Sequence, residues 1–170
     1  MMTPDQVEDA AARLFEAERN RHQIRLLSLD FPDATMDDAY LVQAALVKRK
    51  VASGLTIKGW KIGLTSKAMQ SALAIDIPDS GVLFDDMFFD DGGTVPADRF
   101  IQPRIEAEIA FVMKAPLAGP DVSIDDVRPP MTMPALAALS EMVSKKVLTL
   151  PVSLLMRSMR VSRISSAGVM

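Results

Sequence analysis

The chain has 170 residues, of which 49% are hydrophobic and 24% are charged, the composition of an ordinary soluble globular domain. Its formal charge of −3 provides no basic excess for binding a phosphate backbone, so we expect no nucleic-acid partner. The lack of cysteine excludes disulfides, thiolate zinc sites and cysteine nucleophiles, and a single histidine, His22, excludes any site with two imidazoles. A metal site in this chain would therefore use mainly oxygen ligands, which favours magnesium, manganese or calcium.

The sequence predicts neither export nor a membrane span. The N-terminal segment reaches Asp5 and Glu8 before any apolar run, unlike a secretory signal, and we therefore expect a cytoplasmic protein. The most apolar late stretch, residues 147–156, is 10 residues long and contains Pro151. Because a bilayer span needs roughly 20 apolar residues, we expect no membrane partner.

The composition changes near residue 127. Every aromatic residue lies at or before position 111. The formal charge is −8 through Asp126 and +5 from residue 127 onward. We therefore expect two pieces, residues 1–127 and a divergent tail at 128–170. A reading-frame shift or a gene truncation would produce such a tail.

Capping signals predict two amphipathic helices in the first piece. Thr3 supplies an N-cap hydroxyl, and Gln6 the capping-box partner, of a helix over residues 4–21. Thr35 caps a second helix, over residues 36–53, whose first turn carries two aspartates, and carboxylates favour that positive helix end. Apolar residues recur at helical spacing in both segments, so each helix should bury one face.

Alternation with a period of two residues predicts strands after the helices. The expected strands are residues 57–64, 81–84, 87–89 and 104–113, and residues 66–73 are expected to form a short helix or turn. Helices that precede the strands, rather than alternate with them, indicate an α+β fold.

The 104–113 strand carries two glutamates on one face. Alternation places Glu106 and Glu108 on the side opposite Ile105 and Ile109. Same-face neighbours lie about 6.5–7 Å apart along a strand, so both side chains can reach one divalent ion. The same spacing also fits a solvated strand face.

The 57–64 strand presents a lysine between two glycines. The residues expected on its buried face are Lys58, Trp60, Ile62 and Leu64. The other face then holds Lys61 between Gly59 and Gly63, where a small ligand could approach the backbone and reach the ammonium group. A solvent-facing strand lysine fits this pattern as well.

Asp79, within the sequence PDSG, fits an ordinary turn when taken alone.

Four motifs are informative as a set. They are KGWKIGLTSKAMQ at 58–70, PDSG at 78–81, DDMF at 85–88 and PRIEAEIAF at 103–111. Together they resemble the 2-oxoalkenoate hydratases and decarboxylases of the fumarylacetoacetate hydrolase superfamily, and the resemblance extends over residues 1–127. It implies N-terminal helices followed by part of a mixed β-sheet or β-roll of the fumarylacetoacetase type, truncated in this chain.

The resemblance implies a hydro-lyase of aromatic-compound catabolism that acts, as a homo-oligomer, on a small-molecule 2-oxo-dicarboxylate. Hydration of 2-oxopent-4-enoate and decarboxylation of oxalocrotonate are the alternatives within the superfamily. A magnesium or manganese ion would be the cofactor. The residues implied are Glu106 and Glu108 as metal ligands, Lys61 and Asp79 as catalytic residues, and Ser66, Lys67 and Arg104 as substrate-binding residues.

The chain departs from the family pattern after Asp126. Members of the family supply a third carboxylate ligand there, whereas this chain has Ala137 or Leu139 at the corresponding position, depending on the alignment. Glu141 is the only acidic residue that follows. We therefore expect weak metal binding, with a truncated and catalytically inactive fragment as the alternative.

Overall fold

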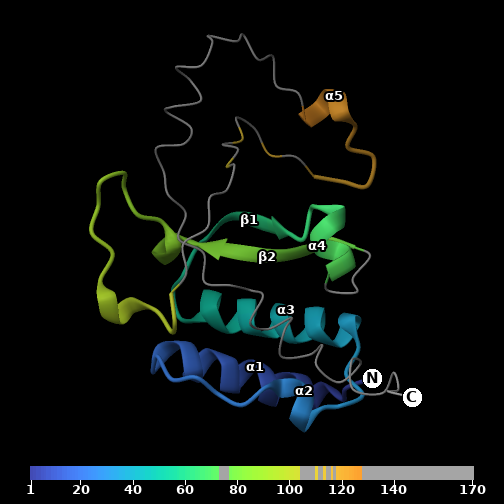
Figure 1. The fold of residues 1–170 in the computed structure, drawn as a ribbon, viewed down its shortest axis with the longest axis vertical. Helices are drawn as coiled ribbons and strands as arrows, with labels where there is room; N and C mark the ends of the chain where they lie inside the picture. Colours follow the sequence, from blue (N-terminus) through green and yellow to red (C-terminus); the bar gives the residue numbers. More distant parts are fainter. Residues whose placement is uncertain (73–76, 104–109, 111–112, 114–115, 117, 128–170) are drawn as a thin grey trace.

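The computed structural model describes residues 1–72, 77–103, 110, 113, 116 and 118–127 (Figure 1). Its helices are α1 (Pro4–Arg19), α2 (Leu27–Asp30), α3 (Met36–Ala52), α4 (Lys67–Ala72) and α5 (Ile124–Val127). Two strands, β1 (Ile57–Gly63) and β2 (Asp79–Phe84), form an antiparallel sheet, and two short 3₁₀ helices, η1 (Asp85–Met87) and η2 (Ala97–Arg99), follow β2. The α+β expectation is confirmed as helices followed by an antiparallel sheet. None of the described helices is long and apolar enough to cross a membrane.

Both long helices begin at the predicted caps. In α1, the Thr3 hydroxyl accepts a hydrogen bond from the backbone N–H of Gln6, and the Gln6 side chain accepts one from the backbone N–H of Thr3. In α3, Thr35 and Asp38 exchange the same pair of bonds. Each capping box satisfies donors that the first helical turn leaves unpaired, so these boundaries follow from local sequence.

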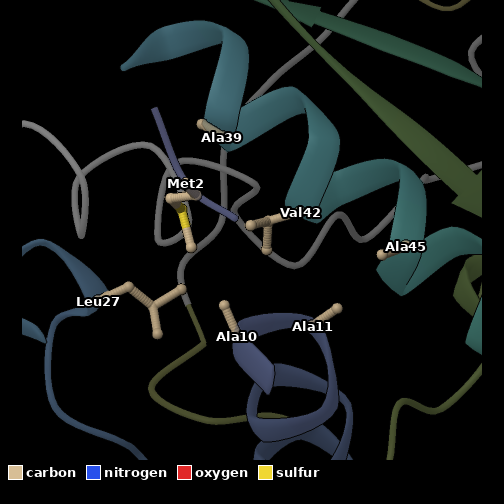
Figure 2. Close-up of a cluster of buried hydrophobic side chains, with 7 residues drawn as sticks. All are labelled: Met2, Ala10, Ala11, Leu27, Ala39, Val42 and Ala45. Carbon is tan, nitrogen blue, oxygen red and sulfur yellow. The ribbon is translucent and has the colours of Figure 1, made fainter. Parts of the chain in front are cut away.

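The helices α1 and α3 pack together through small side chains (Figure 2). The buried core between them and α2 consists of Met2, Ala10, Ala11, Leu27, Ala39, Val42 and Ala45. Alanines at the contact allow the two helices to approach closely, because the distance between packed helices depends on the side chains between them. Leu27 and Val42 are almost fully buried and fill the remaining space.

The sheet packs on α3 through a second apolar cluster. Its buried members are Val82, Leu83, Phe84 and Met87. Val47 of α3 packs against this cluster, together with Leu55 from the segment that leads into β1. Figure 1 shows the resulting order, with α3 between α1 and the sheet. The helix pair is therefore the platform that holds β2 in place.

The predicted strand at 87–89 is reduced to a single β-bridge at Phe88, and Met87 belongs to η1. After β2 the chain turns into η1, because Asp85 binds back to the start of β1: its backbone N–H donates to the carbonyl of Thr56 at 2.9 Å, and its side chain accepts from the backbone N–H of Thr56 at 3.1 Å. The bond that the carboxyl of Asp85 accepts from the Thr56 N–H is the largest cause that holds its pKa below the ordinary value. Met87 is a buried member of the β2 cluster, and Phe88 packs against it.

The predicted buried face of β1 is also wrong. The side chains of Trp60 and Ile62 are 67% and 62% exposed, and Lys58 is exposed as well. The opposite face, with Gly59, Lys61 and Gly63, is half-buried. Alternation correctly sorted the residues into two faces. It could not tell which face the rest of the fold would cover, because that depends on tertiary packing.

Asp38 ties the start of α3 to the N-terminal segment. Its side chain is fully buried and accepts hydrogen bonds from the backbone N–H groups of Met2 and Thr35, each at 2.8 Å. The Thr35 hydroxyl also donates to it at 2.8 Å. The backbone bonds, with that from Thr35 the largest cause, hold the pKa of Asp38 below its ordinary value. A buried carboxylate with several donors is stabilised as the charged form.

We therefore expect Asp38→Asn to lower the free energy of unfolding by about 1–3 kcal/mol at neutral pH, because an amide cannot replace a carboxylate that accepts all three bonds. The pKa is lower in the folded than in the unfolded state, so this stabilisation is fully present above the unfolded value near 4 and is lost as pH falls through the folded value. Urea unfolding measured between pH 2 and 7 checks this.

Asp37→Asn is the matched control, because Asp37 carries the same charge in the same helical turn but is exposed. This variant should lose only the favourable interaction of the charge with the positive end of α3, which contributes about 0.3–1 kcal/mol to the free energy of unfolding. Equal losses of unfolding free energy for Asp38→Asn and Asp37→Asn would contradict the conclusion that the buried hydrogen bonds of Asp38 stabilise the fold.

Candidate functional site

The pairing of β1 with β2 places Lys61 and Asp79 on the same face of the sheet. Lys61 lies opposite Gly81, and Gly63 lies opposite Asp79. Directly opposed residues of an antiparallel pair point to the same side, and diagonal neighbours lie about 7–8 Å apart, within reach of a long side chain. The structure therefore brings together the two residues that sequence analysis selected separately.

Three glycines lie near Lys61 and Asp79 on this face, and Leu83 lies opposite Gly59. Gly59 and Gly63 share the face of Lys61 along β1, and Gly81 is the residue opposite it on β2. Lys61 and Asp79 are both half-buried. The arrangement is a small floor of backbone with one cationic and one anionic side chain, the kind of surface that a compact anionic substrate can approach.

Ser66 and Lys67, predicted to bind substrate, lie where β1 turns into α4. The Ser66 hydroxyl accepts a hydrogen bond from the backbone N–H of Met69 at 3.2 Å. The Lys67 ammonium group donates to the side-chain oxygen of Gln70 at 3.1 Å. Both residues are exposed, and both also stabilise the start of α4. The structure therefore gives each a structural contact, and substrate binding by either stays a prediction.

Gln70 is a buried polar residue of this region that sequence analysis missed. Its side-chain amide donates to the carbonyl of Leu64 at 2.7 Å. Leu64 adopts a left-handed backbone conformation, with φ of 56°, which is uncommon for a residue with a side chain. The amide of Gln70 therefore holds the tight turn that ends β1 directly after Gly63. Sequence offers no local signal for this contact, because it depends on how α4 folds back.

The remaining predicted site residues, Arg104, Glu106 and Glu108, lie outside the described residues. Within the residues that the structure describes, no group of three or more acidic or histidine side chains could hold a metal ion. The carboxylates of Glu106 and Glu108 are the oxygen donors that magnesium prefers, so their chemistry fits the expected ion. Their position relative to Lys61 and Asp79 stays a prediction.

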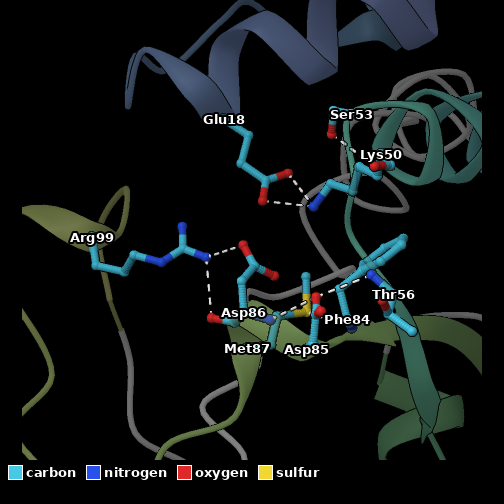
Figure 3. A network of polar contacts seen from close by, with 9 residues as sticks. All are labelled: Glu18, Lys50, Ser53, Thr56, Phe84, Asp85, Asp86, Met87 and Arg99. Carbon is cyan, nitrogen blue, oxygen red and sulfur yellow. Dashed lines mark hydrogen bonds and ion pairs between the residues drawn. The ribbon is translucent and has the colours of Figure 1, made fainter.

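A separate polar network lies at the other end of α3 (Figure 3). The buried ammonium group of Lys50 is 2.6 Å from the Glu18 carboxylate and 4.9 Å from the centre of the Phe84 ring. Arg99 pairs with Asp86 nearby. A cavity of about 480 Å³ is lined by residues of both pairs, but by none of the predicted site residues. This network joins α1, α3 and β2, so its described role is structural.

We expect Gln70→Glu to destabilise the turn after β1 at neutral pH, because a carboxylate cannot donate to the Leu64 carbonyl. The loss should be about 1–3 kcal/mol in the free energy of unfolding, measured in urea. It should shrink at acidic pH, where the new carboxyl group is protonated and can donate again. Lys67→Met, which leaves the bond between Gln70 and Leu64 intact, is the control and should cost less than about 1 kcal/mol. A larger loss for Lys67→Met than for Gln70→Glu would contradict the conclusion that the bond between Gln70 and Leu64 holds this turn.

Comparison with known proteins finds relatives of the first part of the chain, although no family model matches. The chain is 57% identical over 117 residues to 2-oxo-hept-4-ene-1,7-dioate hydratase of Escherichia coli, a match that covers 69% of this chain and 44% of the relative. It is 46% identical to 2-keto-4-pentenoate hydratase of Paraburkholderia xenovorans, covering 66% and 42%. It is 43% identical to 4-oxalocrotonate decarboxylase of a Pseudomonas species, covering 74% and 48%.

A solved structure agrees with these matches. The 4-oxalocrotonate decarboxylase of Pseudomonas putida G7, complexed with magnesium and adipate, superimposes with a TM-score of 0.70 at 42% identity. The superposition covers 75% of this chain and 48% of that one. The same enzyme complexed with calcium and acetate gives the same TM-score. This chain therefore spans less than half the length of each of these relatives.

Proposed function

We propose that this chain carries half of the active site of a metal-dependent 2-oxo acid hydratase. The premise is that its first part belongs to the hydratase and decarboxylase branch of the fumarylacetoacetate hydrolase superfamily. The single observation that supports the chemistry is the shared face of Lys61 and Asp79 over a glycine floor. The substrate would be 2-oxo-hept-4-ene-1,7-dioate. 2-Keto-4-pentenoate hydration and 4-oxalocrotonate decarboxylation remain the alternatives, since relatives with those names also match.

In this proposal the residues divide into metal ligands, catalytic residues and substrate-binding residues. Glu106 and Glu108 would hold a magnesium or manganese ion. When bound, such an ion polarises the carboxylate and 2-oxo group of the substrate as a Lewis acid. Lys61 and Asp79 would exchange protons with the substrate carbon chain or orient the attacking water. Arg104, Ser66 and Lys67 would contact the substrate carboxylates.

The proposal also concerns the architecture. The sheet of β1 and β2 would be one edge of a β-roll of the fumarylacetoacetase type, whose further strands include residues 104–113. Residues 1–127 would form the hydratase-like part, and residues 128–170 a divergent tail. The comparisons support this division, because they cover between 66% and 75% of the chain.

An assay of the purified chain with the three substrates tests the function. Ultraviolet absorbance follows loss of the 2-hydroxydienoate form, and we expect turnover that requires magnesium and stops with a chelator. Lys61→Met and Asp79→Asn should each lower kcat by about 100-fold to 10,000-fold if they move protons. Lys58→Met is the matched control, because Lys58 is exposed on the opposite face of the same strand, and it should leave kcat unchanged.

Two results would contradict the proposal. One is no turnover of any of the three substrates with magnesium or manganese present. The other is an equal loss for Lys58→Met and Lys61→Met, because the two faces of β1 would then not differ in function.

A second candidate function is a hydratase part that works only when another polypeptide completes the fold. Two observations favour it: the chain spans 44% of the matched E. coli hydratase, and the apolar side chains of Trp60 and Ile62 are exposed on β1. Apolar surface of this kind, on a strand, is typical of an interface. The occupant would be the part of a hydratase that this chain does not match.

We expect the chain to copurify with the C-terminal part of the E. coli hydratase when the two are expressed together, and to gain activity from it. Ile62→Glu should abolish the copurification, because it places a charge in the apolar contact. Val51→Glu is the control, since Val51 is equally apolar and 47% exposed but lies on α3. A compact monomer in size-exclusion chromatography, active without the second polypeptide, would contradict this candidate.

A further inference from the structure

Two glycines on the same face of β1 have different surroundings. Neither Gly59 nor Gly63 adopts a positive φ, so neither is required by a left-handed backbone. A methyl group built on Gly59 would meet no atom within 4 Å. A methyl carbon built on Gly63 would lie 2.2 Å from Oδ1 of Asp79, 3.3 Å from its Cγ and 3.7 Å from its Oδ2. The carboxylate of Asp79 therefore occupies the space that a side chain at position 63 would need.

We propose that Gly63 is a positioning residue for Asp79. Its missing side chain lets the Asp79 carboxylate lie across β1, on the face that also carries Lys61. The inference rests on the proposed function for its catalytic meaning, because Asp79 acts on the substrate only within that proposal. The geometric part, that the identity of residue 63 sets the orientation of the Asp79 side chain, stands on the contacts alone.

The register of the sheet places positions 63 and 79 side by side. Gly63 and Asp79 are directly opposed at the end of the β1–β2 ladder, so their side chains project to the same side. A contact of 2.2 Å between a carbon and an oxygen is far inside the sum of their radii, so one of the two groups has to move. Asp79 is the group that can move, because rotation about χ1 swings its short side chain to another staggered position.

This rotation separates the effect on stability from the effect on function. Turning one half-buried side chain costs little folding free energy. It moves the carboxylate oxygens by more than an ångström, however, and a displacement of about 1 Å can cost about 100-fold in rate. Gly63→Ala should therefore produce a protein that folds but whose Asp79 is misoriented.

The first arm of the test measures orientation without any activity. Three-bond couplings from the Asp79 Cγ to the backbone nitrogen and carbonyl carbon report the χ1 rotamer in isotopically labelled protein. Gly63→Ala should change these couplings, and Gly59→Ala, the matched control on the same strand face, should leave them as in the wild type. Unchanged couplings in Gly63→Ala would overturn the inference, whether or not the chain is a hydratase.

The second arm measures catalysis with the substrate that the wild type turns over. Gly63→Ala should lower kcat by about 100-fold with KM changed less than about threefold. In an Asp79→Ala background, Gly63→Ala should cause no further loss, because it acts through a side chain that is no longer there. A further loss in that background would overturn the inference.

The two proposals can fail separately. If the wild type shows no turnover, the proposed function fails, while the couplings still decide the geometric claim. If Gly63→Ala does not fold because its methyl group meets Asp79, then adding Asp79→Ala should remove the contact and restore folding in the double variant. A double variant that also fails to fold would overturn the inference.

Discussion

The antiparallel register between β1 and β2 is the constraint on which the candidate site depends. Because side chains alternate along a strand, a slip of one residue would move Lys61 to the other face and separate Asp79 from Gly63. The pairing is maintained from both ends. The bonds between Asp85 and Thr56 close one end of the ladder, and the turn held by Gln70 follows the other. The register that these contacts maintain places Lys61 and Asp79 on a common face.

The helices contribute to the site by supporting the sheet. The alanine contacts between α1 and α3 bring the two helices close, and Asp38 joins the start of α3 to the N-terminal segment. At the other end of α3, Lys50 connects Glu18 of α1 with Phe84 of β2. The Tyr40 hydroxyl accepts a hydrogen bond from the backbone N–H of Ser80, next to Asp79. One helix therefore contacts β2 near both of its ends, and the strand that carries Asp79 is attached to the helix pair.

The exposed apolar side of β1 and the greater length of the matched relatives both raise the question of what covers that side. Trp60 and Ile62 share β1 with Lys61 but point to the opposite side of it, so the two sides of one strand differ in chemistry. One side carries the polar groups proposed to act on substrate. The other is apolar surface of the kind that folds normally cover, and the described part of the chain leaves it open.

The sequence alone determined the features that depend on near neighbours. The capping boxes at Thr3 and Thr35, the strand over 57–63 and the assignment of Gly59, Lys61 and Gly63 to one face all follow from interactions between residues a few positions apart. The resemblance of the motifs also predicted Lys61 and Asp79 as site residues before any geometry placed them together. Only the tertiary structure decided which face of β1 is covered, that Met87 belongs to a 3₁₀ turn, and that Gln70 secures the turn at Leu64. Coverage of β1 and the bonds between Asp85 and Thr56 join groups distant in the chain, and such contacts exist only once the elements are packed. The bond from Gln70 to Leu64 spans only six residues, but it requires α4 to fold back on the end of β1.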